Sequence, residues 1–179
     1  HLIRGRRFHV RAVGQGPAIV MIHGFAGQMR NFAAVVERLR ASHRIVLIDR
    51  PGSGHSPGRG TDSLTDQAAI VADLIDQLEL DRPLIVGHSL GGAVSMALAL
   101  DHPGKIAGLA LIAPLTQVQE EVPAAFRGLV IEKPAVRAII ANTLAIPMMR
   151  LNSDKSRITL FAPEPVHPAF DIDYGGAML

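Results

Sequence analysis

One short stretch constrains the fold more than any other, because a buried strand runs directly into a helix with a serine at the corner. Residues 84–86 form a continuous apolar run, which is typical of a strand inside a parallel sheet. Helical spacing then takes over in a set of apolar residues: Leu90, Ala93, Val94, Ala97 and Leu98. Between the two patterns lies Gly87-x-Ser89-x-Gly91.

This spacing of glycines indicates a very tight turn at Ser89. Gly87 and Gly91 lack a Cβ atom, so strand and helix can approach each other closely, while Ser89 takes a strained backbone conformation. The hydroxyl then lies at a helix N-terminus, where backbone N–H groups favour a developing negative charge. This is the nucleophile-elbow pattern. The alternative is an ordinary strand-to-helix turn with a buried serine, and the rest of the chain has to decide between them.

Composition excludes several classes of function. Of the 179 residues, 48% are hydrophobic and 19% are charged, which predicts a globular chain with a core, of one domain or one domain plus part of another. The net charge of +2 comes with no basic stripe, so we expect no nucleic-acid partner. The absence of cysteine excludes disulfides, thiol catalysis and thiolate metal sites.

Targeting signals are also missing from the sequence. No apolar run is long enough to span a membrane, and no signal peptide precedes the first expected strand, which favours a cytoplasmic location. The chain begins at His1 without a methionine, so we expect the native N-terminus to be incomplete.

The hydrophobic pattern predicts alternating strands and helices. Strands are expected at residues 7–13, 18–22, 44–49, 84–86 and 106–112. One helical face is expected at Phe32, Val35, Val36 and Leu39, and a second, capped by Ser63 or Thr61, at Leu64, Ala68, Val71, Leu74, Ile75 and Leu78. Continuous apolar strands between helices predict an α/β fold, with a mostly parallel sheet covered by helices on both faces.

The character of the chain changes after Pro114. The following segment reads as helices broken by Pro123, Pro134 and Pro147, and its last part has no clear period. We therefore predict two parts, the N-terminal part of the core at 1–114 and a helical cap over the carboxyl edge of the sheet at 115–179.

Three loops at strand ends carry a recognisable set of motifs. They are His23-Gly24-Phe25, the run Asp49-Arg50-Pro51-Gly52-x-Gly54-x-Ser56, and Gly87-His88-Ser89-Leu90-Gly91-Gly92. In this order and context they resemble the α/β-hydrolase superfamily over residues 7–114, whereas the segment from Gln117 onward is similar only in character to the cap of that family. The resemblance implies an α/β-hydrolase fold.

The resemblance also implies roles for three residues. Ser89 is expected to be the catalytic nucleophile. The backbone N–H groups of Phe25 and Leu90 are expected to form the oxyanion hole, and such a donor is typically worth about 2.7–4 kcal/mol in the transition state. The Phe25 side chain either lines the substrate pocket or packs in the core. Neither a metal ion nor an organic cofactor is implied.

Other polar residues near the motifs are expected to support the loops. His23 and His88 flank the predicted oxyanion loop and nucleophile, and we expect neither to be the catalytic base. Asp49 is expected to anchor its own loop rather than to act as the triad acid. His55 and Ser56 are expected to fix that same loop.

The sequence shows no complete catalytic triad. In this fold the acid and the histidine follow the serine in chain order, and the resemblance places both beyond the cap. The remaining candidates after Ser89 are His102, His167, Asp154, Asp171 and Asp173. His102 is expected to lie a whole helix away from Ser89, His167 is a weak substitute base, and Asp171 and Asp173 read as residues of a solvated loop.

We therefore expect a chain truncated before its last strands and nearly inactive by itself, because losing the triad histidine of a serine protease costs about 10⁶ in kcat. The strand at 106–112 is then expected to be an exposed apolar edge, open to a missing C-terminal segment or to self-association.

Two functions of different classes remain open. The first is a serine hydrolase that forms an acyl-serine on an ester, thioester, lactone or similar carbonyl substrate. A small hydrophobic substrate is suggested by apolar cap residues, which equally suit packing within the cap: Leu144, Ile146, Met148, Met149 and Phe161. The second is a non-catalytic, hydrolase-like accessory or binding protein, since fold alone does not determine function.

Overall fold

The computed structural model describes residues 1–25, 27–58, 60–61 and 63–117. Seven strands and three α-helices lie in these ranges, together with two short 3₁₀ helices at Met29–Phe32 and Pro103–Lys105. In chain order the strands and α-helices are β1 (Leu2–Ile3), β2 (Arg6–Arg7), β3 (Val10–Val13), β4 (Ala18–Ile22), α1 (Ala33–Leu39), β5 (Arg44–Ile48), α2 (Leu64–Gln77), β6 (Leu84–His88), α3 (Leu90–Asp101) and β7 (Gly108–Ile112). Beyond residue 117, the predicted cap lies outside the described residues.

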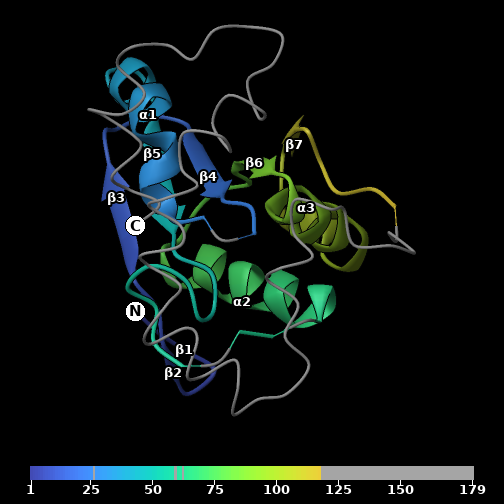
Figure 1. Cartoon of the computed structure of the whole chain (residues 1–179). Helices are drawn as coiled ribbons and strands as arrows, with labels where there is room; N and C mark the ends of the chain where they lie inside the picture. Colours follow the sequence, from blue (N-terminus) through green and yellow to red (C-terminus); the bar gives the residue numbers. More distant parts are fainter. Residues whose placement is uncertain (26, 59, 62, 118–179) are drawn as a thin grey trace, which may run out of the picture. The chain divides into compact units, whose positions relative to one another are not determined.

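Five strands form one mostly parallel sheet, which confirms the predicted fold class (Figure 1). Their order is β3-β5-β4-β6-β7, and only β3 runs antiparallel to its neighbour. In the register of the sheet, Ile22 of β4 pairs with Ile48 of β5 and with Gly87 of β6. The chain therefore leaves these three strands at the same edge, and the three motif-bearing loops begin side by side there.

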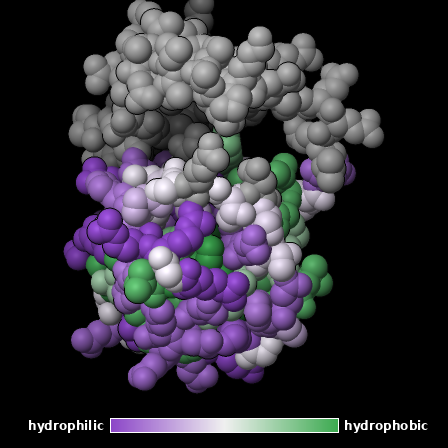
Figure 2. Space-filling view, turned by 90° about the horizontal axis from the view of Figure 1, so that it is seen from below, coloured by the Kyte–Doolittle hydropathy of each residue, from purple (hydrophilic) through white to green (hydrophobic). Residues whose placement is uncertain are grey.

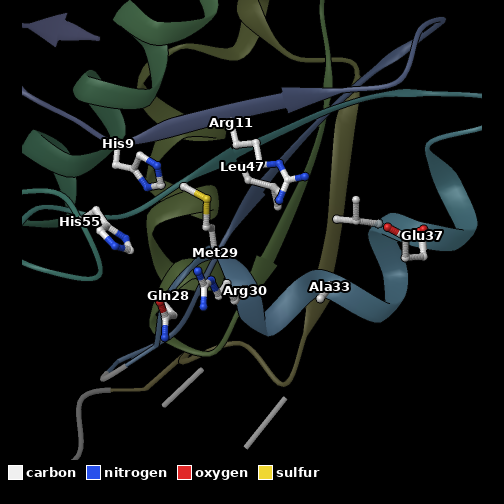
Figure 3. A pocket seen from close by; sticks show the side chains of 10 residues that line it. His9, Arg11, Gln28, Met29, Arg30, Ala33, Glu37, Leu47 and His55 are labelled. Atoms are coloured by element: carbon white, nitrogen blue, oxygen red, sulfur yellow. The ribbon is translucent and has the colours of Figure 1, made fainter. Parts of the chain in front are cut away.

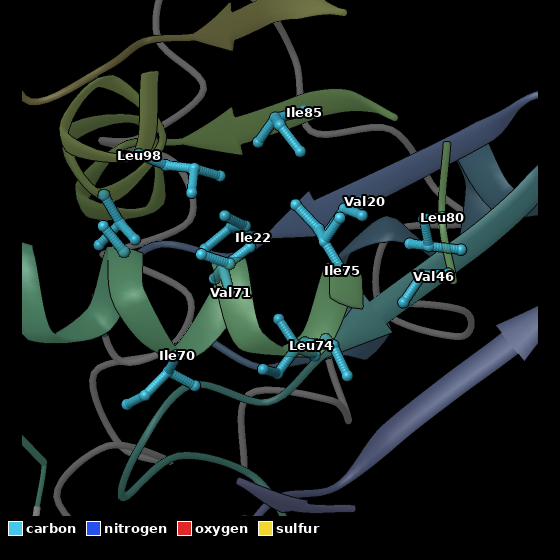
Figure 4. Packing of buried hydrophobic residues seen from close by; sticks show 14 of the residues in the cluster. Val20, Ile22, Val46, Ile70, Val71, Leu74, Ile75, Leu80, Ile85 and Leu98 are labelled. Atoms are coloured by element: carbon cyan, nitrogen blue, oxygen red, sulfur yellow. The ribbon is translucent and has the colours of Figure 1, made fainter. Parts of the chain in front are cut away.

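The continuous apolar runs arise because both faces of the sheet are covered. Val20 and Ile22 of β4 belong to a cluster with α2 and α3, whereas Ile19 and Met21 of the same strand belong to a cluster with α1. Successive side chains of a strand point to opposite faces, so every position of a doubly covered strand is buried. Figure 4 shows the first cluster, in which Val71 and Ile75 of α2 lie next to Val20 and Ile22 of β4.

Helix α2 begins at the expected cap. The Ser63 hydroxyl accepts a hydrogen bond from the backbone N–H of Asp66 at 3.1 Å. Thr61 was the alternative, but its hydroxyl accepts from the N–H of Ser63 instead, at 3.2 Å. Ser63 is therefore the cap.

The structure corrects several expectations near the ends of elements. The single strand expected at 7–13 is interrupted at Phe8 and His9, which separate β2 from β3, and β2 instead pairs with β1 through a turn at Arg4 and Gly5, where both φ angles are positive (50° and 74°). Strand β7 begins at Gly108, after a 3₁₀ turn, rather than at 106. Two residues expected on buried helical faces are exposed, namely Val35 (41%) and Leu64 (36%). Helix α1 covers its sheet face with Val36, which leaves the adjacent Val35 turned about 100° away.

The face of the molecule in Figure 2 is mostly hydrophilic. Hydrophobic side chains interrupt the hydrophilic ones on this face in small groups. Within the described ranges, no helix has the length and apolar character that crossing a membrane requires.

Candidate active site

The turn at Ser89 has the strained geometry that its sequence predicts. Ser89 has φ 52° and ψ −119°, a conformation that side-chain-bearing residues rarely adopt. A Cβ atom on Gly91 would lie 2.1 Å from the carbonyl oxygen of Ile22, and one on Gly87 would lie 2.3 Å from Oγ of Ser95. The two glycines therefore let α3 approach the ends of β4 and β6 closely enough to form the turn.

Backbone hydrogen bonds hold this turn from several sides. The N–H of Ser89 donates to the carbonyl oxygen of Ile112 at 3.0 Å, and its own carbonyl oxygen accepts from the N–H groups of Gly92 (2.9 Å) and Leu115 (3.0 Å). Leu90 is the first residue of α3, and the N–H groups of a first helical turn have no acceptor within their helix. The N–H of Leu90 is thus placed as an oxyanion donor directly after the predicted nucleophile, a role that stays a prediction.

The loop that follows β4 passes next to Ser89. A Cβ atom on Gly24 would lie 3.0 Å from Cβ of Ser89, so only glycine allows this approach without displacement. The Gly24 carbonyl oxygen accepts three hydrogen bonds, from Arg50 Nη2 (2.8 Å), His23 Nδ1 (2.9 Å) and the N–H of Gly27 (3.2 Å). These three bonds fix the direction of the carbonyl group.

This arrangement orients the predicted donor of Phe25. The Gly24 carbonyl and the Phe25 N–H belong to the same planar trans peptide and point in opposite directions. The N–H of Phe25 is consequently turned away from Arg50 and His23. The Phe25 side chain is 64% exposed, which excludes the core-packing alternative.

Arg50 and Gln67 organise the site, and the sequence reasoning missed both. The buried Arg50 guanidinium donates to the carbonyl oxygens of His23 and Gly24, each at 2.8 Å, and to Oε1 of Gln67 at 3.0 Å. Burial lowers the pKa of Arg50. One feature of the sequence could have indicated these contacts. Gln67 is a polar residue beside Ala68 on the buried face of α2, and a buried polar side chain needs a polar partner inside the protein.

His23 is a buried, neutral part of this scaffold. Burial, more than any other cause, lowers its pKa to about 4, and the nearby Arg50 contributes in the same direction. Its Nδ1 donates to the Gly24 carbonyl oxygen, while its Nε2 accepts from the Arg50 N–H at 3.0 Å. With both ring nitrogens occupied, His23 has no atom left to take a proton from Ser89.

Asp49 anchors loops, as expected. Its carboxylate is fully buried and accepts from the N–H of Met29 (2.8 Å) and the N–H of His55 (2.9 Å), and it bonds to His9 Nδ1 (2.9 Å). Burial alone raises the pKa of Asp49, but these three hydrogen bonds outweigh it and the net pKa is lowered. Asp49 follows β5, which β4 separates from β6, so it lies two strand spacings, about 10 Å, from the Ser89 strand.

Ser56 and His55 fix the loop in different ways. The buried Ser56 hydroxyl donates to the Asp49 carbonyl oxygen at 2.6 Å and accepts from the N–H of His9 at 3.0 Å. His55 holds the loop through its backbone N–H, while its imidazole is exposed.

The described residues supply no partner for the Ser89 hydroxyl. Within these ranges, no hydrogen bond reaches that oxygen, and the exposed His88 makes none to it. His102 caps the far end of the twelve-residue helix α3, roughly 18 Å along the axis at 1.5 Å per residue. The other candidates, His167, Asp154, Asp171 and Asp173, lie outside the described residues.

Comparisons with known proteins identify one matching family and several similar proteins. The model of the family described as alpha/beta hydrolase fold matches residues 17–161. A dihydrolipoyllysine-residue acetyltransferase component of the acetoin cleaving system of Cupriavidus necator is 34% identical over 109 residues, which cover 60% of this chain and 29% of that protein. A pimeloyl-[acyl-carrier protein] methyl ester esterase of Chromobacterium violaceum is 40% identical over 107 residues, which cover 58% of this chain and 39% of the esterase.

A solved structure supports the same grouping. The crystal structure of an N-acyl homoserine lactonase complexed with N-butanoyl homoserine matches with a TM-score of 0.57 and 26% identity over 61% of this chain and 42% of the lactonase. The chain thus spans less than half the length of each of these relatives. The family model, in contrast, matches 145 of 179 residues (17 to 161), and the chain belongs to the alpha/beta hydrolase fold family.

Proposed function

We propose that this chain carries the nucleophile-bearing part of a serine hydrolase that acts on an ester or related carbonyl substrate. The observation that carries the proposal is the strained conformation of Ser89, which persists only where the surroundings enforce it. Strain of this kind costs about 1–3 kcal/mol and clusters at functional sites.

The proposed reaction uses three groups of the chain. Ser89 Oγ attacks the carbonyl carbon while its proton passes to a base, and the N–H groups of Leu90 and Phe25 stabilise the oxyanion. Collapse of the tetrahedral intermediate expels the protonated alcohol and leaves an acyl-serine. Water then attacks this ester and releases the acid and the free serine.

The substrate class is supported by two features. One relative is a methyl ester esterase and one structural neighbour is a lactonase, and both names describe the hydrolysis of a carbon–oxygen bond at a carbonyl. The exposed Phe25 side chain next to the predicted oxyanion donor suits a small hydrophobic substrate.

We also propose that the chain by itself turns over slowly. A serine hydroxyl is a weak nucleophile without an adjacent base. Ser89 has no such partner among the described residues, where both ring nitrogens of His23 are already engaged.

The lack of a base beside Ser89 among the described residues favours a second candidate, a hydrolase-like protein that binds a ligand and does not cleave it. Without a base, the turn and the oriented peptide N–H groups still form a site for the carbonyl oxygen or carboxylate of a ligand.

The test of the proposed nucleophile adds imidazole to the solution as an external base. Release of nitrophenol from nitrophenyl butyrate is measured with and without added imidazole, for the wild-type chain, Ser89→Ala and Ser42→Ala. Ser42 is a matched control, because its hydroxyl has a histidine partner (His43 Nδ1 at 2.8 Å) but no strained turn. We expect imidazole to raise the rate of the wild-type and Ser42→Ala chains above that of Ser89→Ala.

Two other outcomes are decisive. Equal rates for folded wild-type and Ser89→Ala chains under both conditions overturn the nucleophile assignment and favour the binding protein. A large Ser89-dependent rate without imidazole shows that a base already reaches Ser89, and overturns the proposal of slow turnover.

A further inference from the structure

Three potential metal ligands meet away from Ser89, and no single motif contains them. They are His9, which precedes β3, Asp49, which follows β5, and His55 in the loop beyond it. One possible ligand atom from each lies within 4.8 Å of the other two. The Asp49 Oδ2 atom is 2.9 Å from Nδ1 of His9 and 3.9 Å from Nδ1 of His55. We propose that His9, Asp49 and His55 form a binding site for a zinc-like divalent transition-metal ion.

The ligand types suit such an ion. Two imidazoles and one carboxylate are a common ligand set for zinc, which binds nitrogen and carboxylate oxygen at about 2.0–2.2 Å. In a tetrahedral site, ligand atoms at those distances lie about 3.3 Å apart. The separation of 2.9 Å has to widen and that of 3.9 Å has to shorten by about half an ångström each, and the half-exposed His9 (43%) and exposed His55 (66%) side chains are free to make these shifts.

The carboxylate is held in place before any ion arrives. Asp49 is fully buried, and the N–H groups of Met29 and His55 fix one oxygen each. Hydrogen bonds of this kind orient metal ligands and lower the cost of organising a site. Across the described ranges, the side chains at salt-bridge distance from this buried anion are the two imidazoles alone. A metal cation bound by Asp49 and the two imidazoles would compensate the buried negative charge of the carboxylate.

Space for further ligands lies alongside. The two rings are 4.9 Å apart between centroids, and both line a cavity of about 380 Å³ beside α1. Figure 3 shows the rings of His9 and His55 side by side at one end of this pocket, with Arg11 and Arg30 on its other walls. Three protein ligands leave a position for water or an anion, as in zinc sites with an open coordination position.

The test measures binding and needs no enzymatic activity. Zinc is titrated into the whole chain by calorimetry, and cobalt is used in parallel because its visible absorption reports coordination by nitrogen and oxygen. We expect one zinc ion per chain at this site. His55→Ala removes a ligand but keeps the backbone N–H on Asp49, and we expect it to weaken binding at least tenfold and to change the cobalt spectrum.

Further variants separate this site from other chelators. His9→Gln keeps a hydrogen-bond donor towards Asp49 and is expected to weaken binding as strongly as His55→Ala. His43→Ala removes a histidine outside the cluster, and His1→Ala removes the imidazole that can chelate together with the terminal amine. Both controls are expected to leave the binding at the cluster unchanged.

Two results overturn the proposal. One is equal zinc affinity of the wild-type, His9→Gln and His55→Ala chains, including no binding by any of them. The other is loss of binding only in His1→Ala or His43→Ala. Either would show that His9, Asp49 and His55 form a hydrogen-bonded cluster that only fixes the loop.

Discussion

At the scale of single residues, the site depends on side chains and backbone groups held in costly states. Ser89 has a positive φ angle, His23 is buried without charge, and Asp49 is buried with its carboxylate bonded to N–H groups. Each of these states is compensated by neighbours from other parts of the chain. Each also predicts how stability responds to one substitution or to pH.

Glycine at position 89 is expected to stabilise the chain. It removes the strain of a side chain at φ 52°, so Ser89→Gly should raise the free energy of unfolding by about 1 kcal/mol. Urea denaturation measures the change, with Ser42→Gly as the control. Ser42 has no positive φ angle, and its substitution should leave stability unchanged or lower it slightly. A destabilised Ser89→Gly chain would contradict the strain argument.

Acid is expected to destabilise the fold through His23. Its pKa of about 4 in the folded chain lies below the value of 6.5 for an unfolded histidine, so the unfolded state binds the proton first as the pH falls. The contribution of His23 is therefore complete above pH 6.5 and is lost towards pH 4. Between pH 7 and pH 5 the loss amounts to about 2 kcal/mol.

Urea denaturation at the two pH values measures this loss. His23→Gln cannot titrate, so its stability should fall less between pH 7 and pH 5 than that of the wild-type chain, whatever its absolute stability. Parallel pH dependences of the two chains would assign the acid sensitivity to other groups.

At the scale of elements, contacts between loops and helices position the strand ends. Arg50, after β5, joins the loop that follows β4 to α2 through the carbonyl oxygens of His23 and Gly24 and through Gln67. We expect Arg50→Lys to lower the free energy of unfolding by about 2–4 kcal/mol. One ammonium group cannot replace the planar fork, and buried carbonyl groups lose their donors.

Thermal or urea denaturation tests this expectation against Arg38→Lys, a substitution on the exposed side of α1. The control should change stability by less than about 0.5 kcal/mol. Equal effects of the two substitutions would mean that the bonds of Arg50 contribute no net stability.

The first turn of α2 gives a second test at this scale. Ser63→Ala removes the acceptor for the Asp66 N–H and should cost about 1 kcal/mol of unfolding free energy, whereas Ser63→Asp keeps an acceptor and should cost little. A difference smaller than a few tenths between the two variants, measured by urea denaturation, would show that water replaces the cap.

At the scale of the whole molecule, β7 is the exposed edge of the described sheet. It pairs with β6 on one side and with no other strand among residues 1–117, and Leu111 (38%) and Ile112 (47%) are exposed. We expect the chain to associate with itself in a concentration-dependent way through this edge, because unpaired strand edges accept further strands. Ile112→Lys should shift the population towards monomer, because charge on an edge strand opposes pairing.

Sedimentation velocity over a range of concentrations measures this association. Leu100→Lys is the control, since Leu100 is 81% exposed on α3 and lies outside the edge. A wild-type chain that remains monomeric at every concentration would contradict the expectation.

The order and type of the core elements could be predicted from the local pattern of apolar residues. Apolar runs marked β4, β5 and β6, because a strand covered on both faces is apolar at every position. The turn at Ser89 could also be predicted from its own stretch of sequence, since the glycines that permit it lie two residues to either side. The sequence pattern did not predict the short strands β1 and β2 or the exposure of Val35, because weak local preferences are overridden by packing in the folded chain.

The contacts that support the site join residues far apart in the chain, and the sequence did not predict them. Arg50 bonds to His23 across 27 positions, and His9 bonds to Asp49 across 40. No periodicity or motif spacing encodes such pairs, because parallel strands bring distant loops to one edge only after the sheet has formed. The direction of the Phe25 N–H and the meeting of His9, Asp49 and His55 are therefore properties of the folded sheet, whereas the position of the tight turn at Ser89 is already indicated by the neighbouring glycines at 87 and 91.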